Sequence, residues 1–324
     1  MHGLGFTTWL LVVLAATAAL VAALLGYVGD RVGDAGAVAT GTAYAWGLAA
    51  RTGGRPAIFS LLALVLGGVV VALDDNALRS GAAVATAVLT AVFAVMVTVP
   101  AAGFVAAVRE TVVALLVSVV GSMATLAWSP AVDLQRFEYT VLGLSLVASF
   151  VTVYRLGAGF HGLGTRGIVA VLAGSVMLAL TVGYAELLQR YGTHGLVASL
   201  DDAVRWSHHH LGAFPRPIIA LLGVPALTWG THMRARRRQG WWVCAFGVAL
   251  TAPVAYALVD PGRSVEEVAL ATAYGVVIGV VLGFVLIRVD LRLTSSRGTR
   301  GRRQAEVEEA AVARPEPGRT HALW

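Results

Sequence analysis

The side chains best suited to chemistry lie together in the stretch DDAVRWSHHHLGAFPRP, residues 201–217. This stretch supplies two adjacent carboxylates and three consecutive imidazoles, and these groups are common general acids and bases. It also supplies an arginine, whose permanent charge could hold a lipid phosphate or an anionic substrate. The candidate catalytic residues are therefore Asp201, Asp202, His208, His209 and Arg216.

The spacing of the histidines disfavours a metal site within this stretch. Consecutive residues of a helix are about 100° apart around its axis, so three adjacent histidines fan over half the circumference and cannot share one ion. No pair of them has the i, i+4 spacing of helical zinc sites, and further ligands would have to come from His194, Asp74 or Asp75. The single cysteine, Cys244, allows no CxxC motif. We therefore predict neither a metal ion nor another cofactor.

The same stretch is also typical of an amphipathic helix that lies on a membrane surface. We expect this helix over residues 196–211, at the outer leaflet, with Trp206 among the lipid head groups. The histidines would then form a solvated face, or sense pH. Most charged residues fall away from a stripe of apolar residues at helical spacing. The stripe contains Leu196, Leu200, Val204 and Leu211.

The composition indicates that most of the chain is surrounded by lipid. Of the 324 residues, 57% are hydrophobic and only 13% are charged, against about 25% charged in soluble domains. A membrane-spanning helix needs roughly 20 apolar residues. We predict an all-α polytopic membrane protein with about ten transmembrane helices, or nine if the short segment 35–50 does not cross. The predicted spans are 5–27, 35–50, 57–73, 81–99, 111–129, 139–154, 167–186, 217–233, 241–259 and 267–287.

The basic residues predict which loops face the cytoplasm. All 24 of them are arginine, and with both termini inside, 17 fall in inner loops and the tail and seven in outer loops. This asymmetry follows the positive-inside rule. The loop THMRARRRQGWW, residues 231–242, has four arginines between tryptophans, which is typical of a cytoplasmic hairpin. Lysine is absent and alanine, valine and glycine abound, which suggests a GC-rich genome. We therefore expect the plasma membrane of a GC-rich bacterium, and the arginine distribution predicts a cytoplasmic C-terminus.

Two regions are expected along the chain. Residues 1–287 form the transmembrane domain, and residues 288–324 form a tail, first basic and then of mixed charge, that lacks apolar periodicity and should be disordered. The expected partners are membrane lipids, including anionic lipid attracted to the basic start of the tail at the cytoplasmic face. Nucleic acid is not expected, because the arginines follow the ends of apolar segments.

A stripe of small residues predicts close helix packing near the end of the transmembrane domain. Gly275, Gly279 and Gly283 form a GxxxGxxxG pattern, which lets a second helix approach to backbone contact. We expect that helix to belong to the same chain. A homo-oligomer or another membrane protein is the alternative.

Prolines within two predicted helices suggest where a substrate could bind. Each frees a backbone carbonyl and can kink its helix, and such breaks often line the cavities of transporters. An arginine at the start of the first of these helices could hold an anionic group, or it could extend to the membrane surface. The candidate substrate-binding residues are Pro225, Pro253 and Arg216.

Three functions stay open at this point. We favour a permease-like protein that handles lipids or apolar solutes, because no charged residue lies in the middle of a predicted span to couple transport to an ion. Ten helices with both ends inside resemble the gross layout of drug/metabolite exporters, and this resemblance implies no residue roles. The first alternative is a membrane-embedded enzyme acting on lipid-linked substrate at the outer leaflet, in which the loop of Asp74 and Asp75 would meet the 201–210 helix. The second is an assembly or scaffold subunit.

Overall fold

The computed structural model contains helices and no strands in the residues that it describes, which are 3–158, 164–237, 239–295 and 316–323. The predicted all-α class is therefore confirmed. Two short elements, η1 (Tyr154–Ala158) and η3 (Ile219–Gly223), are π-helices. The α-helices are α1 (Gly3–Leu24), α2 (Asp30–Arg51), α3 (Pro56–Leu73), α4 (Asn76–Met96), α5 (Phe104–Ala127), α6 (Leu134–Val153), α7 (Gly164–Tyr191), α8 (His194–Leu211), α9 (Val224–Arg234), α10 (Gly240–Ala245), α11 (Val248–Val259) and α12 (Val265–Ser295).

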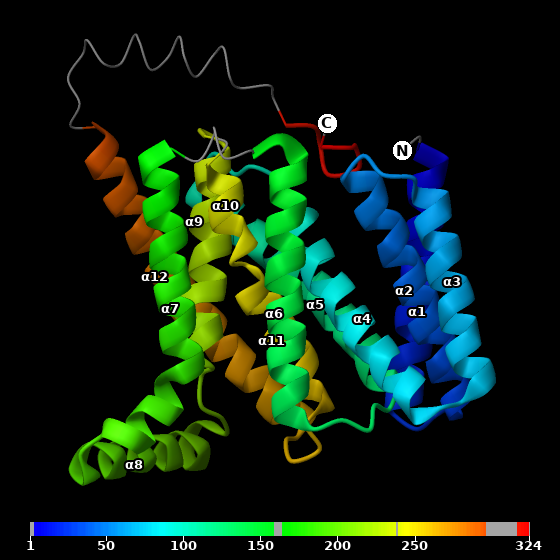
Figure 1. The fold of residues 1–324 in the computed structure, drawn as a ribbon, viewed down its shortest axis with the longest axis horizontal. Helices are drawn as coiled ribbons and strands as arrows, with labels where there is room; N and C mark the ends of the chain where they lie inside the picture. Colours follow the sequence, from blue (N-terminus) through cyan, green and yellow to red (C-terminus); the bar gives the residue numbers. More distant parts are fainter. Residues whose placement is uncertain (1–2, 159–163, 238, 296–315, 324) are drawn as a thin grey trace.

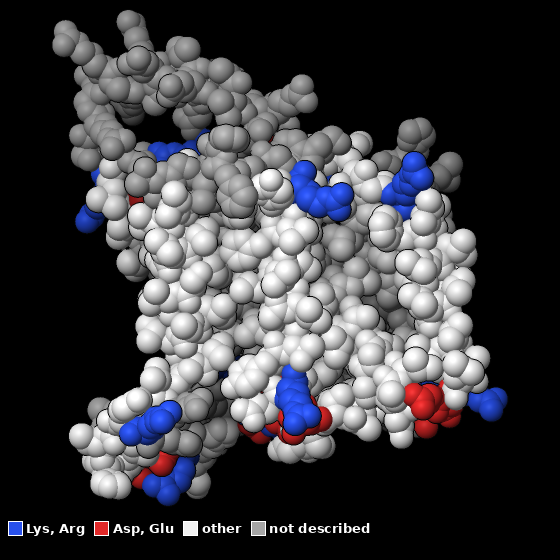
Figure 2. Space-filling model, in the orientation of Figure 1, with Lys and Arg blue, Asp and Glu red and all other residues white. Residues whose placement is uncertain are grey.

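The helices form a bundle in which the chain runs back and forth between two ends (Figure 1). Both chain ends lie at the same end of the bundle, which also carries Arg51 and Arg234 and is named the arginine-rich end. The opposite end carries Asp34 and Asp74 and is named the acidic end. Figure 2 shows that, on the face in view, the described residues between these two ends form a belt without arginine or acidic side chains.

Aspartates begin two of the helices at the acidic end. The Asp75 carboxylate accepts hydrogen bonds from the backbone N–H groups of Ala77 and Leu78, at 2.9 and 3.0 Å. The Asp133 carboxylate accepts one from the N–H of Arg136 at 2.9 Å. Such caps satisfy donors that the first turn of a helix leaves free. Asp75 therefore starts α4 and Asp133 starts α6.

The centre of the bundle is occupied by α11, which packs against α4, α5 and α6. The span from Gly240 to Val259 is almost entirely buried. Hydroxyl groups connect the central helices: Ser118 donates to the carbonyl of Thr251 at 2.6 Å, and the Thr251 hydroxyl donates to the carbonyl of Ala91 at 3.1 Å. Polar bonds of this kind hold helices together where hydrophobic attraction between them is weak.

Pro225 and Pro253 are both buried and shape the contact between two core segments. The π-helix η3 ends two residues before Pro225, and its wider turn makes room for the proline ring. Pro253 leaves the carbonyl of Ala249 without its helical N–H partner. Gly223, the last residue of η3, lies against this carbonyl, because a Cβ atom at Gly223 would be 2.7 Å from the Ala249 oxygen. Only glycine allows so close an approach.

The glycine stripe of α12 packs inside the chain, against η3 and α9. A Cβ atom at Gly279 would lie 2.5 Å from the Cβ atom of Val224. At Gly275 and Gly283 it would lie 2.9 Å from side chains of η3 and α9. The close neighbour of the stripe is therefore a helical segment of the same chain.

Several helices differ from the predicted spans. The helix expected over 111–129 begins at Phe104, so Arg109 and Glu110 lie in α5 and not in a loop. The span 217–233 contains the π-helix η3, and the span 241–259 is divided between α10 and α11. Among the described residues, eight helical segments are long and apolar enough to cross a membrane, judged by length and composition. The expected amphipathic helix is α8, which begins at His194 and lies across the bundle direction at the acidic end (Figure 1).

Part of the tail that we expected to be disordered has defined structure. Residues 288–295 continue α12. Residues 316–323, named the terminal segment, pack against the arginine-rich end, and Leu323 is only 2% exposed. Residues 296–315 of the predicted tail lie outside the described residues.

Candidate functional site

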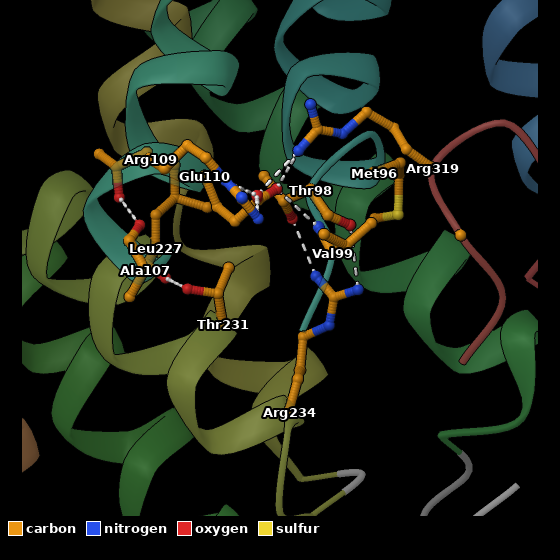
Figure 3. Close-up of polar contacts among 12 residues, drawn as sticks. Met96, Thr98, Val99, Ala107, Arg109, Glu110, Leu227, Thr231, Arg234 and Arg319 are labelled. Atoms are coloured by element: carbon orange, nitrogen blue, oxygen red, sulfur yellow. Dashed lines mark hydrogen bonds and ion pairs between the residues drawn. The ribbon is translucent and has the colours of Figure 1, made fainter. Parts of the chain in front are cut away.

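A cluster of charged side chains lies at the arginine-rich end, between the helices and the terminal segment (Figure 3). Its members come from α2, α5, α9 and the terminal segment. The cluster contains four guanidinium groups and two carboxylates, which leaves two positive charges in excess. We name it the polar cluster, and its members are Arg51, Arg109, Glu110, Arg234, Glu316 and Arg319.

Arg51 is a buried cation whose described hydrogen bonds all go to carbonyl oxygens. Its Nε donates to Met96 at 3.0 Å, and its Nη1 donates to Gly318 at 2.8 Å and to His321 at 2.9 Å. Carbonyl dipoles solvate a charge, but they do not neutralise it as an anion would. Arg51 is therefore the member of the cluster with the greatest capacity for an anionic partner.

Glu110 is fully buried in the first turns of α5. Its carboxylate accepts a hydrogen bond from the N–H of Val99 at 2.9 Å and from Nε of Arg109 at 3.1 Å. Arg319 of the terminal segment donates to both carboxylate oxygens, at 2.8 and 2.7 Å. These charge-assisted bonds compensate the cost of removing the carboxylate from water.

Arg234 is the last residue of α9, and its side chain is completely buried. Its Nη1 donates to the Thr98 hydroxyl at 2.8 Å, and its Nη2 donates to the Glu316 carboxylate at 2.7 Å. The guanidinium carbon also lies 3.5 Å from the centre of the Trp241 ring. This geometry is a cation–π contact, so Arg234 is held from three sides.

The irregular stretch between α4 and α5, residues 97–103, organises the polar cluster. The carbonyl of Thr98 accepts from Arg51 at 3.3 Å and from Arg234 at 3.1 Å, and the next N–H group binds Glu110. Ala101 donates its N–H to a carbonyl of α9 at 3.0 Å. Backbone of this kind is tolerated near a membrane where protein surrounds it, and here it connects three helices.

An apolar cavity of about 390 Å³ begins at the polar cluster and lies between α1, α2, α4 and α5. Arg51, Arg319 and Thr320 line it at one end, and its other lining residues are almost all apolar. Two of these, Leu14 and Leu116, are 56% and 60% exposed. Side chains this exposed show that the cavity is open along α1 and α5 and is not enclosed by the bundle.

The predicted catalytic residues of α8 are not gathered around a common point. Asp202 forms an exposed ion pair with Arg205 on the same helix. Among the described residues, no group of three or more histidine, cysteine, aspartate or glutamate side chains is placed to hold a metal ion. The exposed members of the predicted site are Asp201, Asp202, His208 and His209.

The loop of Asp74 and Asp75, which the enzyme hypothesis requires beside α8, lies elsewhere. In Figure 1, α8 extends from one side of the bundle and the junction of α3 and α4 is on the other. Asp74 accepts from Nε of Arg79 at 2.7 Å, and Arg79 also binds both oxygens of Asp34 at 3.0 Å. These aspartates therefore stabilise the acidic end and do not form a site with α8.

Arg216 lies in the connection between α8 and η3, away from the polar cluster. Its guanidinium carbon is 5.7 Å from the centre of the Tyr256 ring. Burial lowers the pKa of Arg216 from its ordinary value. Neither Arg216 nor the prolines Pro225 and Pro253 line the apolar cavity. The predicted substrate-binding residues therefore do not share its walls.

The polar cluster is the feature that sequence reasoning missed. Arg51, Arg109 and Arg234 were interpreted as loop residues that fix topology, although two of them are buried. One signal was available: Glu110 is the only acidic residue in the predicted inner loops. An acid that stands alone among arginines is well placed to pair with several of them.

The eight apolar helical segments and the uncharged belt between two charged ends define a multi-pass helical membrane protein. No model of a known protein family matches the chain, and no curated protein or solved structure is significantly similar to it. Its function therefore has to be argued from the polar cluster and the apolar cavity.

Proposed function

We propose that this protein is a permease-like membrane protein that takes the apolar chain of a lipid or similar amphiphile out of the bilayer. The observation that carries the proposal is the apolar cavity of about 390 Å³ with guanidinium groups at one end. Its volume is within the range of ligand pockets, roughly 300–1,000 Å³. An apolar wall with a charged end matches a molecule that has a hydrocarbon chain and a polar head.

The place of the cavity in the bundle also supports an amphiphile. On α1 the lining runs from Phe6 to Leu14, which is about 12 Å at 1.5 Å per residue. It reaches from the arginine-rich end, at Arg51, to Val120, which lies past the midpoint of α5. A chain lying there would point toward the bilayer centre with its head at the membrane surface, as lipids do.

The buried carboxylates favour a mechanism without ion coupling. In the described part of the chain, the buried acidic residues are Asp34 and Glu110, and each is paired with arginine. A carboxylate that couples transport to an ion has to bind and release that ion. Guanidinium groups already bind both carboxylates, so neither carboxylate is free to bind a coupling ion. We therefore propose that the cavity binds its substrate without a coupled ion.

We further propose ten membrane crossings with the arginine-rich end in the cytoplasm of a bacterium, at the plasma membrane. Support for the two additional crossings comes from α2 and from the segment of η3 and α9, which continue the alternation of chain direction in Figure 1. Support for the orientation comes from the 17 arginines assigned to that side of the 24 in the chain. Anionic lipids of the cytoplasmic leaflet would then be close to the cavity entrance.

The proposal is tested by photolabelling in vesicles with a palmitate that carries a diazirine near the end of its chain. We expect the probe to label the cavity walls, and excess unlabelled palmitate to suppress this labelling. The probe should also label the lipid-facing α3, and unlabelled palmitate should not suppress that labelling. Leu10→Trp places a large ring in the cavity and should remove most of the suppressible labelling. Leu11→Trp is the matched control, because Leu11 is 61% exposed and does not line the cavity.

Two results would contradict the proposal. One is labelling of α1 and α5 that unlabelled palmitate never reduces, since it would mean ordinary contact with surrounding lipid. The other is an equal effect of both tryptophan variants, since only Leu10 is a cavity residue.

A further inference from the structure

The terminal segment covers the polar end of the apolar cavity. Arg319 and Thr320 line that end. The N–H group of Leu323 donates to the carbonyl of Arg51 at 2.8 Å, and its side chain is buried. The carbonyl of Gly318 accepts from Arg51 at 2.8 Å. The segment is therefore bound along most of its length to the residue that ends α2.

The two charged side chains of the segment bind partners of opposite sign. Glu316 accepts from Arg234 at 2.7 Å, and Arg319 donates to Glu110 at 2.7 and 2.8 Å. One acid and one base leave the net charge of the cluster unchanged. Without the segment, three guanidinium groups of the helices would face one carboxylate, again two positive charges in excess.

We propose that the terminal segment occupies, from within the same chain, the head-group site of the cavity, and that the carboxylate or phosphate head of a single-chain amphiphile displaces it. This inference rests on the proposed function, because the chain of the amphiphile would lie in the apolar cavity. The Glu316 carboxylate on Arg234 and the carbonyl oxygens on Arg51 are acceptors of the kind that an anionic head presents.

The distribution of partners explains why the segment can leave. Without the segment, Glu110 would keep its bonds to Arg109 and to the N–H of Val99. Arg234 would keep its bond to Thr98 and its contact with the Trp241 ring. Displacement therefore leaves most of the helix-borne cluster partnered.

Arg51 is the exception, and this identifies where the head binds. All three acceptors of its Nη1 belong to the terminal segment, namely the carbonyls of Pro317, Gly318 and His321. Once the segment leaves, this nitrogen has no other described acceptor. An anionic head would replace neutral carbonyls with charge-assisted bonds, which are roughly twice as strong. A neutral head could not offset the two excess charges.

Hydrogen–deuterium exchange of the unaltered chain in neutral detergent tests this directly. The peptide 316–324 contains the N–H of Leu323, bonded to Arg51, and the N–H of His321, bonded to Gly318. Palmitate and hexadecyl phosphate should both accelerate exchange in this peptide, whereas hexadecanol, with the same chain and no charge, should not. An effect of only one anion would identify the preferred head.

A variant without residues 316–324 and the variant Glu316→Gln provide the second measurement. Suppressible palmitate photolabelling should rise roughly ten-fold on truncation, because apparent affinity scales with the fraction of molecules in which the site is open. Glu316→Gln should give a smaller rise. Glu266→Gln removes an exposed acid at the other end of the bundle and is the control for net charge.

The outcomes separate this inference from the proposed function. If palmitate labels the cavity but exchange in peptide 316–324 and labelling after truncation stay unchanged, the cavity proposal stands and the displacement is wrong. If hexadecanol accelerates exchange as much as palmitate does, the anionic head site is wrong. If the truncated chain also shows no suppressible labelling, both proposals fail.

Discussion

Replacing Gly223 with alanine should destabilise the protein, because the added methyl group would collide with backbone. A Cβ atom at this position would lie 2.2 Å from the nitrogen of Leu250 and 2.4 Å from the carbonyl carbon of Ala249. Ordinary contacts of a Cβ atom are 3.4–4 Å, so η3 and α11 would have to separate by about 1 Å to restore normal packing. Backbone atoms cannot rotate away as a side chain can.

The expected magnitude follows from two opposing effects. Forcing a methyl group into a packed interior typically costs about 1–3 kcal/mol, and this site belongs at the upper limit because the obstacle is the central helix. Alanine in place of glycine returns about 1 kcal/mol of helix propensity. We therefore expect Gly223→Ala to lower the free energy of unfolding by about 2 kcal/mol.

In the control variant, the free energy of unfolding should change in the opposite direction, so the two substitutions can be told apart. Gly68 is in the middle of α3, and a Cβ atom there would meet nothing within 4 Å. Gly68→Ala should therefore raise the free energy of unfolding by about 0.5–1 kcal/mol. Both variants can be compared by titrating sodium dodecyl sulfate into mixed micelles and following tryptophan fluorescence. Equal stabilisation by the two substitutions would refute the close contact between η3 and α11.

Two further predictions concern the orientation of the chain and the helix at its surface. Because Cys244 is buried, an added cysteine can be detected alone: a membrane-impermeant maleimide on intact cells should label Pro261→Cys and leave Arg236→Cys unlabelled. Labelling of the second variant alone would invert the proposed orientation. On α8, a spin label at Leu200→Cys should be accessible mainly to oxygen, which concentrates in lipid, and one at Asp201→Cys mainly to a water-soluble nickel complex. Equal accessibility to the nickel complex would place α8 in water, away from the membrane surface.

The helices could be predicted from the sequence because apolar length is a local property. Runs of apolar residues identified the eight apolar helical segments, and the stripe around Leu200 identified α8. The interruptions were harder to predict. Pro225 was recognised as a break, but the packing of η3 against α11 was not, because it joins segments that are separated in the chain.

The polar cluster could not be predicted because its bonds connect distant positions. Arg319 is 209 residues from Glu110, and Glu316 is 82 residues from Arg234. The composition of the tail indicated that it has no hydrophobic core of its own. It did not indicate which residues of the helices its charged side chains would bind. Loop arginines also satisfy the positive-inside rule equally well whether they are solvated or buried, so topology did not reveal Arg51 as an interior residue.

Arg79 at the acidic end and Arg51 at the arginine-rich end have different partners, and this difference bears on where an anion can bind. At the acidic end, Arg79 is paired with Asp34 and Asp74, so one cation faces two carboxylates and gains nothing from a further anion. At the arginine-rich end, four cations face two carboxylates, and Arg51 has only carbonyl partners among its described bonds. The apolar cavity begins at the second of these ends. A hydrocarbon-lined space and unneutralised positive charge therefore coincide, and that coincidence is what an anionic amphiphile requires.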